Sequence, residues 1–128
     1  MKTILVVDDE YGLVETLTEL LQSEGYRVVS AANGQDGLER VKQEKPDLVL
    51  TDFMMPLSNG RDLVRGIRAL PELASTPVIM MTASTRTVAL TDERGTVEVA
   101  SFLRKPVAWE RLLEGIVKLI GPGVERPA

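Results

Sequence analysis

Short apolar runs alternate along this chain with segments whose apolar residues recur at helical spacing. Three runs are continuous and rich in β-branched residues, namely Thr3–Val7, Leu48–Thr51 and Val78–Met81. Continuous apolar runs of this length are typical of strands that are buried on both faces of a parallel sheet. Two further strands are predicted at Arg27–Ala31 and Ala100–Arg104.

Helices are predicted between these strands. The first has an apolar stripe from Leu13 to Leu21 and stops at Gly25, and others are expected over about 34–44, 61–70 and 108–119. Alternating strands and helices imply parallel strands joined by right-handed crossovers. The pattern therefore predicts an α/β fold, a flavodoxin-like doubly wound (βα)5 three-layer sandwich with sheet order 2-1-3-4-5. Its ligand crevice would lie at the carboxyl ends of the first and third strands.

Composition narrows the class of protein. The 128 residues, 44% of them hydrophobic, suit one domain over residues 1–120, with 121–128 as a disordered tail or the start of a linker. The absence of cysteine and histidine excludes disulfides, thiolate zinc sites and histidine catalysis. A net charge of −4 without a basic run argues against direct nucleic-acid binding. No apolar stretch reaches membrane-spanning length, so a soluble cytoplasmic protein is expected.

Polar residues follow four of the predicted strands: Asp8-Asp9-Glu10, Asp52, Thr82-Ala83 and Lys105-Pro106. Each has an ordinary explanation alone, such as a helix-capping carboxylate, a turn, a structural threonine or a solvated lysine. At neighbouring carboxyl ends of a parallel sheet they would instead converge. Three carboxylates in contact raise one another's pKa, and a bound cation relieves their repulsion. A set of metal ligands that contains oxygen atoms but no nitrogen or sulfur favours Mg²⁺ or Mn²⁺.

This ordered set resembles the receiver domain of two-component response regulators, of the single-domain chemotaxis type, over nearly the whole chain. The resemblance implies that Asp52 is the phosphoacceptor and that Asp9 and Asp52 bind the metal directly. Asp8 would bind it mostly through water, and the backbone carbonyl of Met54 would supply a further ligand. Met54 and Ser84 occupy the positions that tune phosphoryl lifetime in receivers.

The resemblance also assigns the remaining site and switch residues. Lys105 would neutralise charge on the transferred oxygens, and the Thr82 hydroxyl would turn inward to bond the phosphoryl group. Phe102 would be the switch aromatic that moves with Thr82. The bond to Pro106 is cis in receivers, which directs the lysine into the site. Strand alternation points Arg104 away from Lys105, which predicts a surface role.

The segment Thr85–Val99 departs from the family pattern, which has an alanine-rich fourth helix ending in Ala-Gly-Ala. Threonine and valine weaken helices, and Gly95 comes earlier in the sequence than the glycine of the family pattern, whose place Glu98 occupies. A short or irregular fourth helix followed by a longer connection is expected. The alternative is an ordinary helix of poor propensity that packs through Val88 and Leu90. This face carries the output surface of most receivers.

The leading functional hypothesis is a phosphoacceptor switch, not an enzyme beyond its own phosphoryl transfer and dephosphorylation. A histidine kinase or phosphotransfer protein would donate the phosphoryl group, and output would be by contact with an unidentified protein. Formation of a homodimer is a further possibility. One alternative is a receiver-like binding module that works without phosphorylation. A weaker one is a phosphatase with an aspartate nucleophile, because Met54 stands where such enzymes place their acid.

Overall fold

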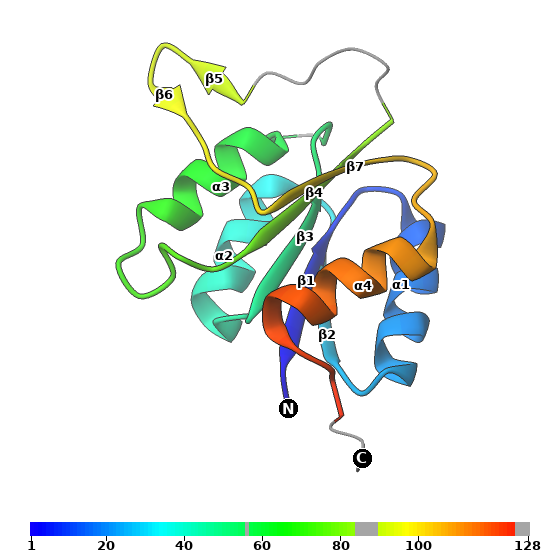
Figure 1. Ribbon diagram of the computed structural model, residues 1–128. Coiled ribbons are helices and arrows are strands. Elements are labelled where there is room, and N and C mark those ends of the chain that lie inside the picture. The colour runs from blue at the N-terminus through cyan, green and yellow to red at the C-terminus, as the bar shows by residue number, and fades with distance from the viewer. Residues whose placement is uncertain (56, 84–89, 125–128) are drawn as a thin grey trace.

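The chain folds as a parallel sheet between two layers of helices (Figure 1). This computed structural model describes residues 1–55, 57–83 and 90–124. The sheet contains β1 (Thr3–Val7), β2 (Arg27–Ala31), β3 (Leu48–Asp52), β4 (Val78–Thr82) and β7 (Ser101–Arg104). Its order is β2-β1-β3-β4-β7, so the predicted order 2-1-3-4-5 is confirmed, with β7 as the fifth strand of the sheet.

In the described part of the chain, four helices flank this sheet: α1 (Tyr11–Ser23), α2 (Gly34–Glu44), α3 (Gly60–Arg68) and α4 (Trp109–Ile120). The N-terminus of α2 is capped by Asn33, whose side chain accepts a hydrogen bond of 2.7 Å from the Asp36 amide. Asn59 caps α3 in the same way by accepting from the Asp62 amide at 2.9 Å. Such caps satisfy backbone donors that have no partner within the helix.

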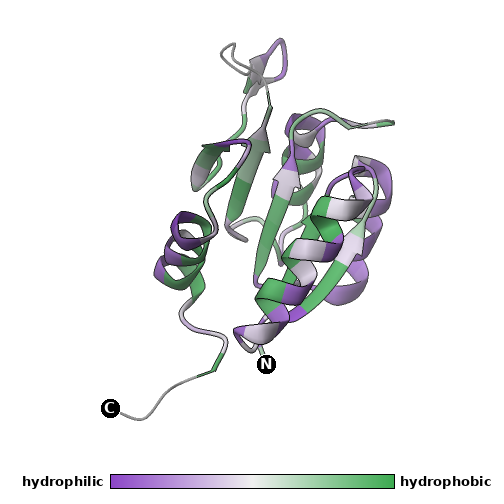
Figure 2. Cartoon of the chain, turned by 90° about the vertical axis from the view of Figure 1, so that its right-hand side faces the viewer, coloured by the Kyte–Doolittle hydropathy of each residue, from purple (hydrophilic) through white to green (hydrophobic). Residues whose placement is uncertain are grey.

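Two apolar cores lie on opposite faces of the sheet. In β1, Ile4 and Val6 face the core beneath α1 and α4, whereas Leu5 and Val7 face the core beneath α2 and α3. Both faces of the strand are therefore buried, which explains its continuous apolar sequence. Figure 2 shows the strands as hydrophobic along most of their length, with hydrophilic residues gathered on the helices.

The structure differs most from expectation at residues 90–99. These residues contain no helix but an antiparallel hairpin of β5 (Thr91–Asp92) and β6 (Gly95–Thr96). An ordinary fourth helix that continues through residues 90–99 is therefore wrong, while residues 84–89, including Val88, where a short helix would fall, lie outside the described residues. The threonines suit a strand, and Gly95 adopts a left-handed φ of 110° that favours glycine. Buried Val97 anchors the segment on the core beneath α3.

Ion pairs fix this hairpin to α3. The Arg65 guanidinium donates two hydrogen bonds to the Asp92 carboxylate, at 2.7 and 2.9 Å. Arg94 in the hairpin turn donates to Asp62 in the first turn of α3 at 3.0 Å. A bidentate arginine–carboxylate pair fixes orientation as well as distance. The hairpin and α3 therefore form one unit at the position where the sequence pattern of receivers has a helix.

The residues directly after α4 contact the amino-terminal half of the fold. The Tyr26 hydroxyl donates a hydrogen bond of 2.6 Å to the Gly121 carbonyl, so the residues after α4 contact the turn between α1 and β2. No helix within the described ranges is long and apolar enough to span a bilayer.

Candidate functional site

Three carboxylates meet at the carboxyl end of the sheet. Asp8 follows β1 and Asp52 ends β3, and these strands pair in parallel through Val7 and Thr51. With Asp9, each offers a carboxylate oxygen, and the three oxygens lie within 4.8 Å of one another. Asp8 and Asp52 are buried, whereas Asp9 is exposed. The parallel register thus produces the convergence that the sequence pattern indicates.

Lys105 brings a positive charge to this cluster from the end of β7. Its ammonium nitrogen lies 2.7 Å from an Asp8 oxygen and 3.5 Å from an Asp52 oxygen. The Lys105 amide donates a 2.7 Å hydrogen bond to the Thr82 carbonyl, and the bond to Pro106 is cis. Burial lowers the pKa of Lys105, but its hydrogen bond to Asp8 and the two carboxylate charges outweigh this effect, so the net direction is upward.

The electrostatic balance of the cluster is negative. Burial raises the pKa of Asp52, the Asp8 charge raises it further, and Lys105 only partly opposes both. Three carboxylates against one ammonium leave uncompensated negative charge in a partly buried place. Oxygen donors with excess negative charge fit a hard divalent cation such as Mg²⁺ or Mn²⁺.

The predicted switch residues lie on the neighbouring strands. Thr82 is the last residue of β4 and is buried. Phe102, on β7, lies opposite Met80 of β4 and is 39% exposed. Arg104 is also exposed, in agreement with its predicted surface role. The Met54 side chain is 66% exposed, and its carbonyl as a metal ligand stays a prediction. Ser84 lies outside the described residues.

Two contacts at the site did not follow from the sequence pattern. Glu10 places a carboxylate oxygen 3.7 Å from the Lys105 nitrogen, although its side chain is largely exposed. Gly60, the first residue of α3, donates a 2.8 Å hydrogen bond to the Phe53 carbonyl. A Cβ atom at Gly60 would lie 2.6 Å from the Asp52 carbonyl oxygen, so this close approach requires glycine. The available sequence signal is the Asn59-Gly60 pair, a combination typical of turns.

The sequence pattern of the response regulator receiver domain family matches residues 4–117. The chain belongs to this family. Receivers are modules of two-component signalling that interact with kinases or phosphotransfer proteins and are not conventional enzymes. The predicted family and fold are therefore confirmed.

Known proteins support the assignment. Protein PilH of Pseudomonas aeruginosa is 38% identical over 117 residues, which cover 91% of this receiver and 95% of PilH. The DNA-binding response regulator MtrA of Mycobacterium tuberculosis is 44% identical over 85 residues, covering 66% of this chain but only 36% of MtrA. The structure of TrrA from Thermotoga maritima in complex with Mg(2+)-BeF is 32% identical. It matches with a TM-score of 0.80 over 94% of this chain and 100% of TrrA.

Proposed function

We propose that this receiver accepts a phosphoryl group on Asp52 in the presence of Mg²⁺ or Mn²⁺ and thereby changes a surface that contacts another protein. A histidine kinase or a phosphotransfer protein would be the donor. The observation that supports the proposal is the joint position of three acidic side chains, Asp8, Asp9 and Asp52, with the Lys105 ammonium beside two of them. TrrA, a relative of the same fold, has been captured with Mg(2+)-BeF.

The proposed step is a phosphoryl transfer. An Asp52 carboxylate oxygen attacks phosphorus, the P–N bond of the donor phosphohistidine breaks, and the imidazole leaves with the bonding electrons. Lys105, 3.5 Å from Asp52 in this structure, offsets negative charge on the transferred oxygens. A divalent cation held by Asp9, Asp52 and, through water, Asp8 would supply further charge neutralisation. Asp52 keeps its oxygen as part of an acyl phosphate.

Transmission would begin at the two groups nearest the modified carboxylate. The phosphoryl group adds a charge of about −1.5 to −2, which attracts the Lys105 ammonium and the Thr82 hydroxyl. The backbone hydrogen bond of 2.7 Å from Lys105 to Thr82 links the ends of β7 and β4. A movement of Thr82 would therefore be felt along β7, where Phe102 is half exposed.

A receiver-like module that works without phosphorylation is the second candidate. The hairpin in place of a helix at residues 90–99 favours it, since the output face of this chain differs from the family pattern. The complete set of site residues favours the switch. The two candidates differ in whether modification of Asp52 alters anything beyond the site.

The test uses beryllofluoride, a stable mimic of the phosphoryl group, with Mg²⁺. Backbone amide NMR spectra would be compared for the wild type, Asp52→Asn and Glu39→Gln, a control that removes one exposed negative charge from α2. Shifts extending from Asp52 through Thr82 to Phe102 are expected in the wild type and in Glu39→Gln. They are expected to vanish in Asp52→Asn. Shifts limited to the acidic site, or equal shifts in Asp52→Asn, would contradict the proposed switch.

A further inference from the structure

The buried side of α2 begins with two glycines one helical turn apart. Gly34 and Gly37 are both buried, and Val41 continues the same side of the helix. Residues three positions apart lie on one face of a helix. Alanine forms helices better than glycine, so two glycines on this face indicate that something approaches it too closely for a side chain.

Gly37 contacts the end of β1. A Cβ atom at position 37 would lie 3.1 and 3.2 Å from the two methyl carbons of Val7. Val7 is fully buried, and a β-branched side chain has little rotamer freedom, so it cannot turn aside. Relief therefore requires the end of the strand to shift by a few tenths of an ångström. Asp8 and Asp9 follow directly after Val7, so such a shift reaches the acidic cluster.

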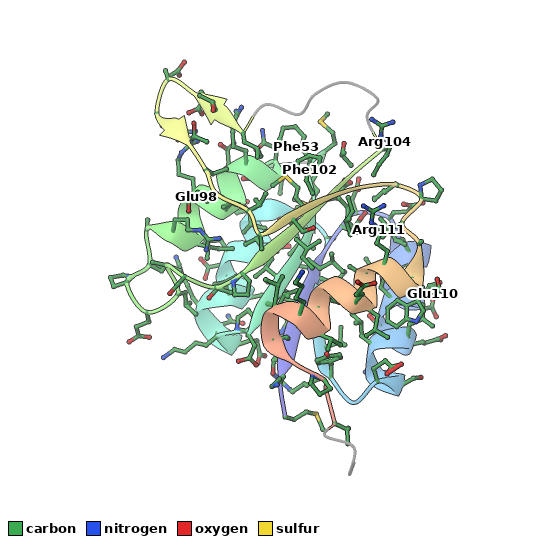
Figure 3. The ribbon with its side chains drawn as sticks, in the orientation of Figure 1. Phe53, Glu98, Phe102, Arg104, Glu110 and Arg111 are labelled. Atoms are coloured by element: carbon green, nitrogen blue, oxygen red, sulfur yellow. The ribbon has the colours of Figure 1, made fainter. Side chains whose placement is uncertain are left out.

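Gly34 contacts the segment that follows Asp52. A Cβ atom at position 34 would lie 2.5 Å from the Ser58 carbonyl oxygen and 2.8 Å from the Ser58 Cβ atom. Ser58 precedes α3 by two residues, and Gly60 at the start of α3 is hydrogen-bonded to the Phe53 carbonyl. Figure 3 shows Phe53 beside the first turn of α3, at the carboxyl end of the sheet. The helix α2 thus touches both segments that carry the acidic residues.

The backbone before Ser58 is strained and needs such a support. Leu57 has a left-handed φ of 71°, which is uncommon for residues other than glycine. Conformations of this kind persist only where the surrounding structure holds them. The close packing of Gly34 on Ser58 is one contact that holds this loop in place.

Spacing decides which cation a carboxylate cluster prefers. Mg²⁺ requires near-octahedral oxygen ligands at about 2.0–2.1 Å, whereas Ca²⁺ accepts irregular sets at about 2.3–2.6 Å. The shift that a Cβ atom at position 37 would cause, a few tenths of an ångström, equals the difference between these two ranges. A site for the smaller ion is therefore sensitive to the close approach of α2.

We propose that Gly34 and Gly37 are positioning residues of the acidic site. By letting α2 approach β1 and the loop before α3 closely, they set the spacing of the three carboxylates and favour Mg²⁺ over the larger Ca²⁺. Both act through Val7 and Ser58 and bind no cation themselves. The inference rests on the proposed function in one respect, namely that the cluster binds a divalent cation.

Gly37→Ala is the test variant, and Gly66→Ala is its matched control. A Cβ atom at position 66, in α3, would lie 3.0 and 3.1 Å from two carbons of Leu38, so it is crowded to the same degree. Leu38 lies in α2 and can move the end of its flexible side chain, and neither residue adjoins an acidic residue of the cluster. Both variants replace glycine by alanine inside a helix, so helix propensity changes equally.

The experiment titrates the metal-free full chain with Mg²⁺ and, separately, with Ca²⁺, and follows the amide NMR signals of the acidic cluster. Gly37→Ala is expected to weaken Mg²⁺ binding about tenfold, as changes in the surroundings of metal ligands commonly do, and Ca²⁺ binding distinctly less. Gly34→Ala is expected to act in the same direction. Gly66→Ala is expected to keep the Mg²⁺ to Ca²⁺ affinity ratio of the wild type.

A rescue variant separates positioning from a general loss of stability. Val7→Ala removes both methyl groups that the new Cβ atom would meet, so adding it to Gly37→Ala should restore the affinity ratio. The double variant also loses buried apolar surface and is expected to unfold more easily than Gly37→Ala. A purely structural effect would therefore grow worse in the double variant instead of recovering.

The outcomes distinguish the two proposals. A wild type that binds neither cation would contradict the proposed function and this inference with it. A wild type that binds Mg²⁺ would contradict the inference alone if Gly37→Ala kept the wild-type affinity ratio or if Gly66→Ala changed the ratio equally. Failure of Val7→Ala to restore the ratio would also overturn it.

Discussion

Lys105 donates a hydrogen bond of 2.7 Å to Asp8 across 97 positions of sequence, and the Asp8 side chain is fully buried. A buried carboxylate is costly unless it is paired, so this contact supports the fold as well as the site. On the proposed function, the lysine would pair with Asp8 in the unmodified protein and with the transferred oxygens once Asp52 is modified.

Replacing Lys105 by methionine is expected to destabilise the metal-free protein by about 3–5 kcal/mol, because Asp8 is left buried without its cation. Saturating Mg²⁺ is expected to restore part of the loss, since a divalent cation supplies the missing charge. Urea unfolding in chelator and in Mg²⁺ measures both values. Lys118→Met, an exposed change on α4, is the control and is expected to be nearly neutral. Identical losses with and without Mg²⁺ would show that no cation binds beside Asp8.

Asp52→Asn is expected to raise the melting temperature in chelator at neutral pH. The pKa of Asp52 is raised in the fold by burial and by Asp8, so its ionised form opposes folding. This cost is present at pH values above the folded pKa and is absent below the unfolded value of about 3.9. The advantage of the variant should therefore shrink as the pH falls toward that value. Melting curves against pH measure it, with Glu39→Gln as control. A variant that is less stable than the wild type at pH 7 would contradict the sign.

Asp92→Asn is expected to release the hairpin from α3. Burial raises the pKa of Asp92, but hydrogen bonds from the Arg94 amide and the Arg65 guanidinium, with the charges of both arginines, lower it overall. A lowered pKa stabilises the fold above the unfolded value of about 3.9, and the stabilisation is lost as the pH falls through the folded value. Hydrogen exchange over residues 90–99 should accelerate in the variant at neutral pH, and the difference should narrow in acid.

Glu93→Gln is the matched control for that experiment, because Glu93 lies in the same hairpin turn and is exposed. Equal acceleration in the two variants would mean that net charge, rather than the Arg65–Asp92 pair, holds the hairpin.

Gly60→Ala and Gly115→Ala are expected to have opposite effects. A Cβ atom at position 60 would lie 2.6 Å from the Asp52 carbonyl oxygen, so the backbone must move at Asp52. A Cβ atom at position 115 meets only an Ile79 carbon at 3.9 Å, inside helix α4. The first variant should lose stability and respond less to beryllofluoride. The second should gain about 0.5–1 kcal/mol, the usual difference between alanine and glycine in a helix. Unfolding curves of both variants test the contrast.

The three central strands, β1, β3 and β4, were predictable because their burial on both faces produces a continuous apolar run. Thr3–Val7 and Val78–Met81 needed no tertiary information, and right-handed crossovers limited the sheet orders to a few, of which the flavodoxin-like one was chosen. The acidic cluster followed in turn, since parallel strands place their carboxyl ends at one edge. Local periodicity and topology together were enough to bring Asp8 and Asp52 into contact.

The hairpin at residues 90–99 could not be derived in the same way. Its stability comes from partners far along the chain, since Arg65 and Asp62 on α3 hold Asp92 and Arg94. Threonine content indicated that a helix would be weak, but no local sequence signal predicted a hairpin in its place. The closeness of Gly60 to Asp52 likewise depends on how α3 approaches β3, which a single sequence does not encode as a pattern.

The distance along the chain between Asp8 and Lys105 has a consequence for how the receiver folds. Asp8 lies near the start of the chain, whereas Lys105, the cation that pairs with it, follows the last strand of the sheet, β7. Contacts between residues so far apart in sequence are slow to form, because a long loop must close first. On the proposed function, phosphoryl uptake would therefore require β7 to be in place, because the strand's end positions Lys105 beside Asp8 and Asp52.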